Sequence, residues 1–142
     1  PHKMNTKIKL AAGLALFLLV IGCSKEPGIG GNSSITGSLR SVAEYNPVTQ
    51  DTTWYTMAQE DVYIIYGEDN TIAYHDSYET SWNGEFRFDN LRKGTYYLFV
   101  YEKCAACDDN RNAIFKTVTI DKTGLEVDAG VFSIDDDEVF LP

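Results

Sequence analysis

After Ser34 the chain is a succession of short β-type segments separated by turn signals, and no stretch of it shows a helical period. Such segments at spacings of roughly 8–12 residues are typical of an antiparallel β-sandwich. Asn46-Pro47 and Asn83-Gly84 are among the turn signals that separate them. The sequence therefore predicts an all-β fold, an antiparallel sandwich of seven or eight strands, at residues 35–42, 52–57, 62–66, 71–78, 85–88, 95–101, 113–120 and 125–134.

The alternation of side chains along these segments predicts the core. On both sides of the Lys93-Gly94 turn, every second side chain is apolar, with Leu91 beside them, and we expect these side chains to line one inner face. Its members are Phe86, Phe88, Leu91, Tyr96, Leu98 and Val100. Segments 35–42 and 52–57 are expected to form a hairpin, and the polar segment 71–78 an edge strand.

In segments 62–66 and 95–101, the side chains that alternate with the predicted core residues are also apolar, although a solvated sheet face is normally polar. This pattern would gather five large side chains on one outer face: Tyr63, Ile65, Tyr97, Phe99 and Tyr101. Exposed apolar patches often mark interfaces, and tyrosine suits protein and sugar partners alike. We expect either a partner-binding surface, or a second small core covered by the N-terminal hairpin or by the tail Val139-Phe140-Leu141.

The N-terminal stretch is expected to be an export signal covering residues 1–22. Lys7 and Lys9 precede an unbroken apolar run over residues 10–21, which is well short of the ~20 residues that a spanning helix needs. Met4 is the expected start, so the three residues before it are interpreted as an artefact.

The end of this stretch, Val20-Ile21-Gly22-Cys23, resembles a bacterial lipobox. The resemblance implies diacylglycerol on the Cys23 thiol, cleavage before Cys23, and acylation of its new amine by a fatty acid such as palmitate. Two or more acyl chains hold a protein stably on a membrane, which a single chain does not. Residues 23–33 are expected to form the lipidated cysteine and a Gly-rich flexible tether, and residues 34–142 the sandwich domain.

A second resemblance covers residues 80–100, TSWNGEFRFDNLRKGTYYLFV. This stretch is similar to the signature of carboxypeptidase-regulatory-like and related transthyretin-like (prealbumin-like) domains. Ser81 replaces the usual Asp, and Glu60-Asp61 stands where Gly-Ala is usual. The resemblance implies a seven-stranded sandwich of a kind that serves as stalk, spacer or binding domain. Leader, tether and sandwich together resemble lipoproteins of Bacteroidota, which implies a cell-envelope location, at the outer membrane and facing either the periplasm or the surface.

Cys104-Ala105-Ala106-Cys107 is the one motif with a catalytic form. A redox CxxC sits at a helix N-terminus, which lowers the thiol pKa, whereas this one follows a strand and precedes two acids, Asp108 and Asp109. The interpretation we favour is a small structural disulfide between Cys104 and Cys107, and thiol–disulfide exchange is the alternative. Structural zinc would need four ligands, which this motif does not supply.

Alternating oxygen ligands at Asp108, Asn110 and Asn112 are weak calcium candidates. A calcium loop also needs Gly at its sixth position and Glu at its twelfth, where this chain has Ala113 and Thr119. We therefore interpret the stretch as a solvated loop, and we expect neither a metal nor another cofactor.

The formal net charge of −9 disfavours nucleic acid as a partner. No nucleophile–base pair or phosphate-binding loop stands out, so the sequence predicts no enzyme. The predicted function is a lipid-anchored cell-envelope lipoprotein whose sandwich is a non-enzymatic binding or structural module for protein or glycan. The alternative is a thiol–disulfide redox protein using Cys104 and Cys107.

Overall fold

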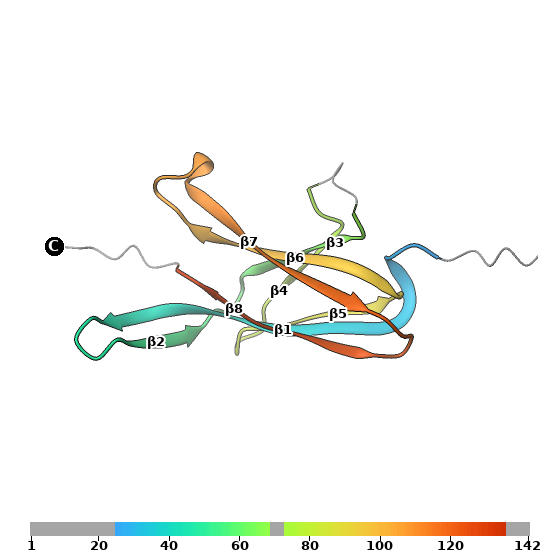
Figure 1. The fold of residues 1–142 in the computed structure, drawn as a ribbon, viewed down its shortest axis with the longest axis horizontal. Coiled ribbons are helices and arrows are strands. Elements are labelled where there is room, and N and C mark those ends of the chain that lie inside the picture. The colour runs from blue at the N-terminus through green and yellow to red at the C-terminus, as the bar shows by residue number, and fades with distance from the viewer. Residues whose placement is uncertain (1–24, 69–72, 136–142) are drawn as a thin grey trace, which may run out of the picture.

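The computed structural model of the protein describes residues 25–68 and 73–135. They form two stacked β-sheets of four strands each, which confirms the all-β sandwich (Figure 1). Among the described residues, one 3₁₀ turn, Asp108–Asn110, interrupts the strands. The strands are β1 (Ile29–Asn46), β2 (Asp51–Thr56), β3 (Asp61–Tyr66), β4 (Asp76–Glu79), β5 (Glu85–Leu91), β6 (Gly94–Lys103), β7 (Arg111–Ile120) and β8 (Glu126–Ile134).

The first sheet is built around β1, with β5 and β2 following one another along one edge and β8 along the other. The second sheet has the order β4-β3-β6-β7, so the edge position expected for the polar segment before Glu79 is confirmed for β4. One pairing differs from the antiparallel expectation, because β1 and β8 run parallel. Side-chain alternation reports which face a residue occupies but not the direction of its neighbouring strand.

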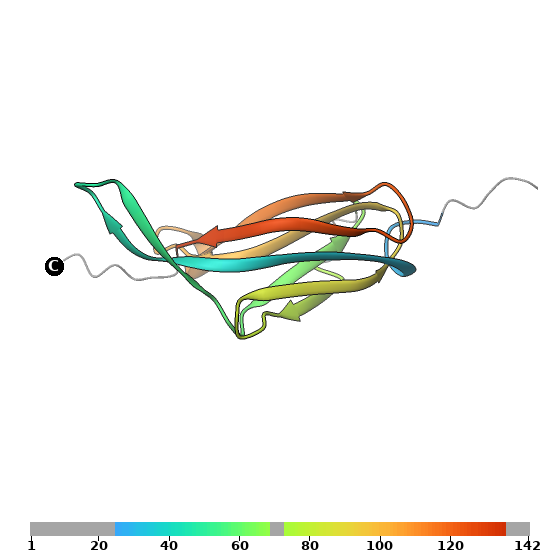
Figure 2. The same cartoon turned by 90° about the horizontal axis from the view of Figure 1, so that it is seen from below.

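The long strand β1 sets the shape of the molecule. It runs for 18 residues, so at about 3.3 Å per residue it spans roughly 55 Å. Its first half pairs with β5 and its second half with β2, which confirms the expected hairpin. That hairpin projects beyond the sandwich at the end opposite to the start of β1 (Figures 1 and 2).

The core lies between the two sheets. All six residues predicted to be inward are buried, but they belong to two facing sheets, Phe86, Phe88 and Leu91 on β5 and the other three on β6. The expectation of one inner face was therefore wrong, because the turn at Lys93-Gly94 carries the chain from one sheet to the other. Further buried members are Ile35, Leu39, Met57, Val62, Ile64, Val118, Ile120, Phe132 and Ile134.

The expected tether is mostly part of the folded domain, because β1 already begins at Ile29. Gly28 is held in place just before it. The Gly28 N–H donates to the Tyr96 hydroxyl at 3.0 Å, and that hydroxyl donates to the Arg92 carbonyl at 2.7 Å. Burial raises the pKa of Tyr96, so its hydroxyl stays protonated at any ordinary pH. The domain boundary therefore lies near Gly28 rather than Ser34.

Candidate functional site

The outer face of the second sheet carries the candidate residues in register. Tyr63 on β3 pairs with Phe99 on β6, which in turn pairs with Phe115 on β7. Ile65 and Tyr97 form the next pair along the same strands. The structure therefore brings the five predicted side chains onto neighbouring strands, as the alternation requires.

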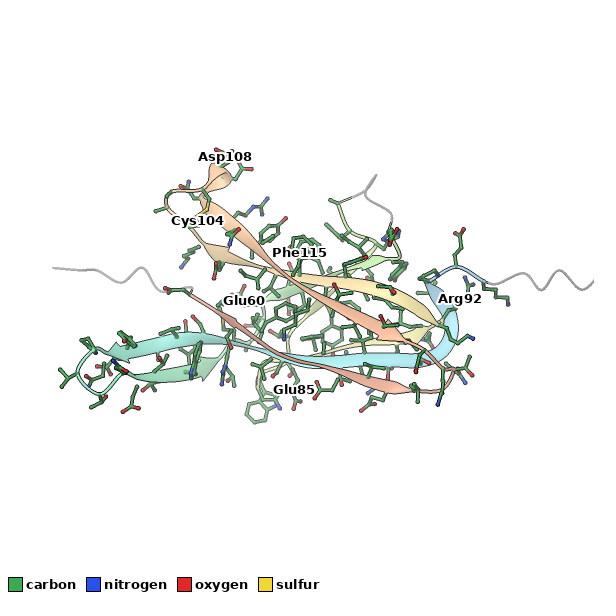
Figure 3. The ribbon with its side chains drawn as sticks, viewed as in Figure 1. Glu60, Glu85, Arg92, Cys104, Asp108 and Phe115 are labelled. Atoms are coloured by element: carbon green, nitrogen blue, oxygen red, sulfur yellow. A yellow bond between two sulfur atoms is a disulfide. The ribbon has the colours of Figure 1, made fainter. Side chains whose placement is uncertain are left out.

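Four rings form a continuous line across this face, which we call the aromatic row: Tyr74, Tyr63, Phe99 and Phe115. Adjacent centroids are 4.8 Å apart for Tyr74 and Tyr63, 4.9 Å for Tyr63 and Phe99, and 5.1 Å for Phe99 and Phe115. Tyr101 lies beside the row, with its ring edge-on to Tyr63 at 5.7 Å and to Phe99 at 5.5 Å. Phe115 marks the β7 end of the row (Figure 3).

Exposure is unequal along the row. Phe99 is only 4% exposed, so the expectation that it is an exposed contact residue was wrong. The neighbouring rings of the same face cover it, while Tyr63, Ile65 and Tyr97 are half-buried. The accessible surface belongs to three rings: Tyr74 at 47%, Tyr101 at 36% and Phe115 at 57%.

The sequence suggested two segments that could cover this aromatic face, the N-terminal hairpin and the C-terminal tail. The N-terminal hairpin belongs to the first sheet and projects past its end, so it does not lie over the aromatic row (Figures 1 and 2). The tail Val139-Phe140-Leu141 lies outside the described residues. Phe99 therefore owes its burial among the described residues to its own sheet face.

Polar groups border the exposed rings. The guanidinium of Arg111 lies over the Tyr101 ring, 4.2 Å from its centroid, and no described residue accepts a hydrogen bond from it. On the other side, the Tyr63 hydroxyl donates to the Asp61 carboxylate at 3.4 Å. Burial, and next the charge of Asp61, raise the pKa of Tyr63. The face thus offers apolar rings with a cationic donor and an anionic acceptor at its border.

Sequence reasoning missed three members of this site: Tyr74, Arg111 and Phe115. Phe115 has the outward parity of its strand, but only the β6–β7 register places it beside Phe99. Tyr74 was assigned to a strand, yet it precedes β4 and reaches back over Tyr63. Its position depends on loop conformation, for which the sequence pattern holds no signal.

Cys104 and Cys107 form a disulfide in the loop between β6 and β7, at the same end of the molecule as the projecting hairpin (Figure 3). The Cys104 N–H donates to the Asn110 carbonyl at 3.1 Å, so a backbone hydrogen bond also joins the two ends of this loop. The 3₁₀ turn after Cys107 is too short to act as a helix N-terminus, and its two acids disfavour a thiolate. This setting matches the structural disulfide better than the redox alternative.

Replacing both Cys104 and Cys107 with serine is expected to lower the melting temperature only slightly. The crosslink closes a very short loop, so its entropic contribution lies below the ~3 kcal/mol of a 15-residue loop. Thermal unfolding of the wild type and the double variant measures the difference. A cysteine pair found reduced in the native envelope, with a thiol pKa well below the usual value of about 8.5, would instead favour the redox alternative.

The calcium candidates do not converge on one point. Asp108 and Asn110 lie in the 3₁₀ turn, whereas Asn112 lies in β7 and its amide donates to the Glu102 carboxylate at 3.1 Å. Within residues 25–68 and 73–135, no group of three or more His, Cys, Asp or Glu side chains is placed to hold a metal ion.

The first sheet also borders a shallow hollow of about 550 Å³. Its lining includes polar residues such as Glu85, Arg87 and Glu126, and also Phe86 and, from β4 of the second sheet, Tyr78. Arg87 pairs with Glu126 at 2.6 Å and with Asp89 at 2.7 Å, so its charge is already matched. The projecting hairpin exposes further apolar side chains, among them Tyr45 and Val48.

No protein-family model matches the chain, and no curated protein matches it. The fold is similar to a crystal structure from Pseudomonas aeruginosa of a protein provisionally described as carbohydrate binding. The TM-score is 0.47 and the sequence identity 17%, over 73% of this chain and 91% of that chain.

Proposed function

We propose that this protein is a lipid-anchored component of the bacterial cell envelope whose β-sandwich is a non-enzymatic binding module. The observation that carries the proposal is the cluster of exposed rings on the outer face of the second sheet, formed by Tyr74, Tyr101 and Phe115. Single exposed rings are common on proteins, but contiguous apolar patches often mark interaction sites. Tyr101 and Phe115 pack against the buried Phe99, so their rings also lose little conformational entropy on binding.

The path of the chain supports the anchor. Only residues 24–27 separate Cys23 from Gly28, which the hydroxyl of Tyr96 fixes to the sandwich. That stretch reaches at most about 18 Å, so a lipid on Cys23 would hold this end of the domain close to the bilayer. The described residues contain no helix long and apolar enough to cross a membrane, and Cys23 with its leader lies outside them.

Mass spectrometry of the mature N-terminus tests the anchor. We expect the first residue of the protein from native membranes to be Cys23, carrying diacylglycerol and an amide-linked fatty acid. The Cys23→Ala variant should be released from the membrane fraction, because no acyl chain then holds it. Recovery of an unacylated Cys23 still joined to the preceding residues would contradict the anchor.

Site-specific photo-crosslinking tests the binding face. A photoreactive residue in place of Phe115 should capture an envelope component in intact cells. The matched control carries the same group in place of Trp82, which is 86% exposed in the turn before β5 and is not a member of the aromatic row. Equal capture at both positions, or none at position 115, would contradict the assignment of this face.

A further inference from the structure

Two successive residues just before β4 contact strand β3 on its two faces. Tyr74 lies on the outer face, where its ring packs on Tyr63 at 4.8 Å between centroids. His75 lies on the inner side, where its ring stacks on Tyr66 at 4.5 Å between centroids and 20° between planes. Tyr66 faces inward because it pairs across the sheet with the buried Tyr96. The place of the Tyr74 ring in the aromatic row therefore depends on how firmly His75 is held.

Two hydrogen bonds hold His75 on β3. Its backbone N–H donates to the Ile64 carbonyl at 2.8 Å, and its Nδ1 atom accepts the backbone N–H of Tyr66 at 3.0 Å. A backbone N–H can only donate, so Nδ1 must carry a lone pair and no proton. A protonated imidazole has hydrogen on both ring nitrogens and would set two donors against each other. This contact thus requires the uncharged form of His75.

Four other titratable groups lie near this contact. Glu26 and Glu68 line the same hollow as His75 and Tyr66, and Asp76 follows His75 as the first residue of β4. Carboxylates ordinarily titrate around pH 4, whereas histidine ordinarily changes charge between about pH 5 and 8. Burial, and next the charge of Asp76, raise the pKa of Tyr66, so its hydroxyl stays protonated throughout that range. A change of the contact in mild acid would therefore report on the imidazole.

We propose that His75 positions Tyr74 in the aromatic row only while its imidazole is uncharged, so that mild acid releases Tyr74 and weakens binding at this face. The inference rests on the proposed function, because it adds regulation to the same face. Its sign follows from proton binding: the attached form has no proton on Nδ1 and the released form can take one up, so the attached form is lost as the pH falls. Tyr74 is one of the three exposed rings, and its release would leave Phe115 in place.

NMR spectroscopy of the mature protein in detergent micelles tests the contact without any ligand. Between about pH 8 and about pH 5, we expect the His75 ring protons and the Tyr66 amide proton to titrate with one midpoint. The nuclear Overhauser effect between the rings of Tyr74 and Tyr63 should weaken over the same range, because the two rings then separate.

Two substitutions of His75 separate its charge from its other contacts. In His75→Asn the side-chain oxygen takes the place of Nδ1 and accepts a hydrogen bond at every pH, so the contact between Tyr74 and Tyr63 should persist in mild acid. His75→Phe keeps a ring to stack on Tyr66 but offers no acceptor, so the contact should be weak at every pH.

Photo-crosslinking from position 115 connects the contact with binding. Capture at about pH 5 should fall about fivefold from its value at about pH 8, which corresponds to the ~1 kcal/mol of one ordinary contact. When the same group is combined with His75→Asn, capture should be equal at the two pH values.

Three outcomes would overturn the inference: a contact between Tyr74 and Tyr63 that mild acid leaves unchanged, a change that His75→Asn shows as fully as the wild type, or capture that stays constant while the contact titrates. The second would assign the change to the neighbouring carboxylates, and the third would show that Tyr74 takes no part in binding. If position 115 captures nothing at either pH, the proposed function fails, and the NMR titration alone decides whether His75 positions Tyr74.

Discussion

The Phe99→Ala variant is expected to lose about 3 kcal/mol or more of unfolding free energy. The Phe99 ring is 4% exposed and contacts one ring on each of three strands. The distances between centroids are 4.9 Å to Tyr63 on β3, 5.5 Å to Tyr101 on β6 and 5.1 Å to Phe115 on β7. Removing it forfeits the burial of one large ring and leaves a cavity beneath three others. Those neighbours are held by their own strands and collapse into the gap only in part.

Phe115→Ala is the matched control, because Phe115 lies in the same row but is 57% exposed. Its loss should cost well under the Phe99→Ala value, since little apolar surface leaves water when that ring packs. Urea unfolding of the wild type and both variants measures the free energies, and equal slopes would show that the unfolded states are comparable. If Phe99→Ala unfolds like Phe115→Ala, the rings do not shield Phe99 in solution.

Most strands could be located from the sequence because each carries its own alternation and turn signals. Val62 and Ile64 point inward as that alternation requires, and Tyr63 and Ile65 point outward. The parallel pairing of β1 with β8 could not be predicted, because it joins segments from opposite ends of the chain. The pairing of such distant strands is determined by the packing of the whole sandwich and not by a local sequence pattern.

The candidate site was predictable to the same extent. The outward parity of Tyr97, Phe99 and Tyr101 follows from period two. Their burial does not, since it depends on which side chains stand beside them. Phe99 is covered because the β6–β7 register places Phe115 beside it. An outward-facing side chain on a central strand can therefore be buried by its neighbours even where the rest of that sheet face is exposed to solvent.

The glycines near the start of β1 were interpreted as a flexible tether because of their composition, yet the structure requires them for packing. At Gly31 a methyl group would overlap with the backbone carbonyl of Leu91 and would lie 2.7 Å from the Cα of Arg92. Both neighbours are backbone atoms at the end of β5, so neither can turn aside as a side chain could. The close approach of β1 to β5 at this point therefore excludes any residue with a Cβ.

Gly31→Ala is accordingly expected to destabilise the protein by at least about 3 kcal/mol, at the upper end of the usual cost of overpacking. Because Tyr96 fixes Gly28 close by, the shift needed to make room would also disturb the 3.0 Å hydrogen bond between them. Asn32→Ala is the control: it changes an exposed neighbour in the same strand and should alter stability by no more than about 0.5 kcal/mol. Thermal and urea unfolding of both variants measure the two changes in stability.

If residues 28–33 form a loose tether in solution, Gly31→Ala will unfold like Asn32→Ala, since a methyl group on a flexible segment meets no fixed backbone. A large loss in Gly31→Ala alone would place the start of the folded domain at Gly28, and it would leave only the few residues after Cys23 between the sandwich and its proposed lipid.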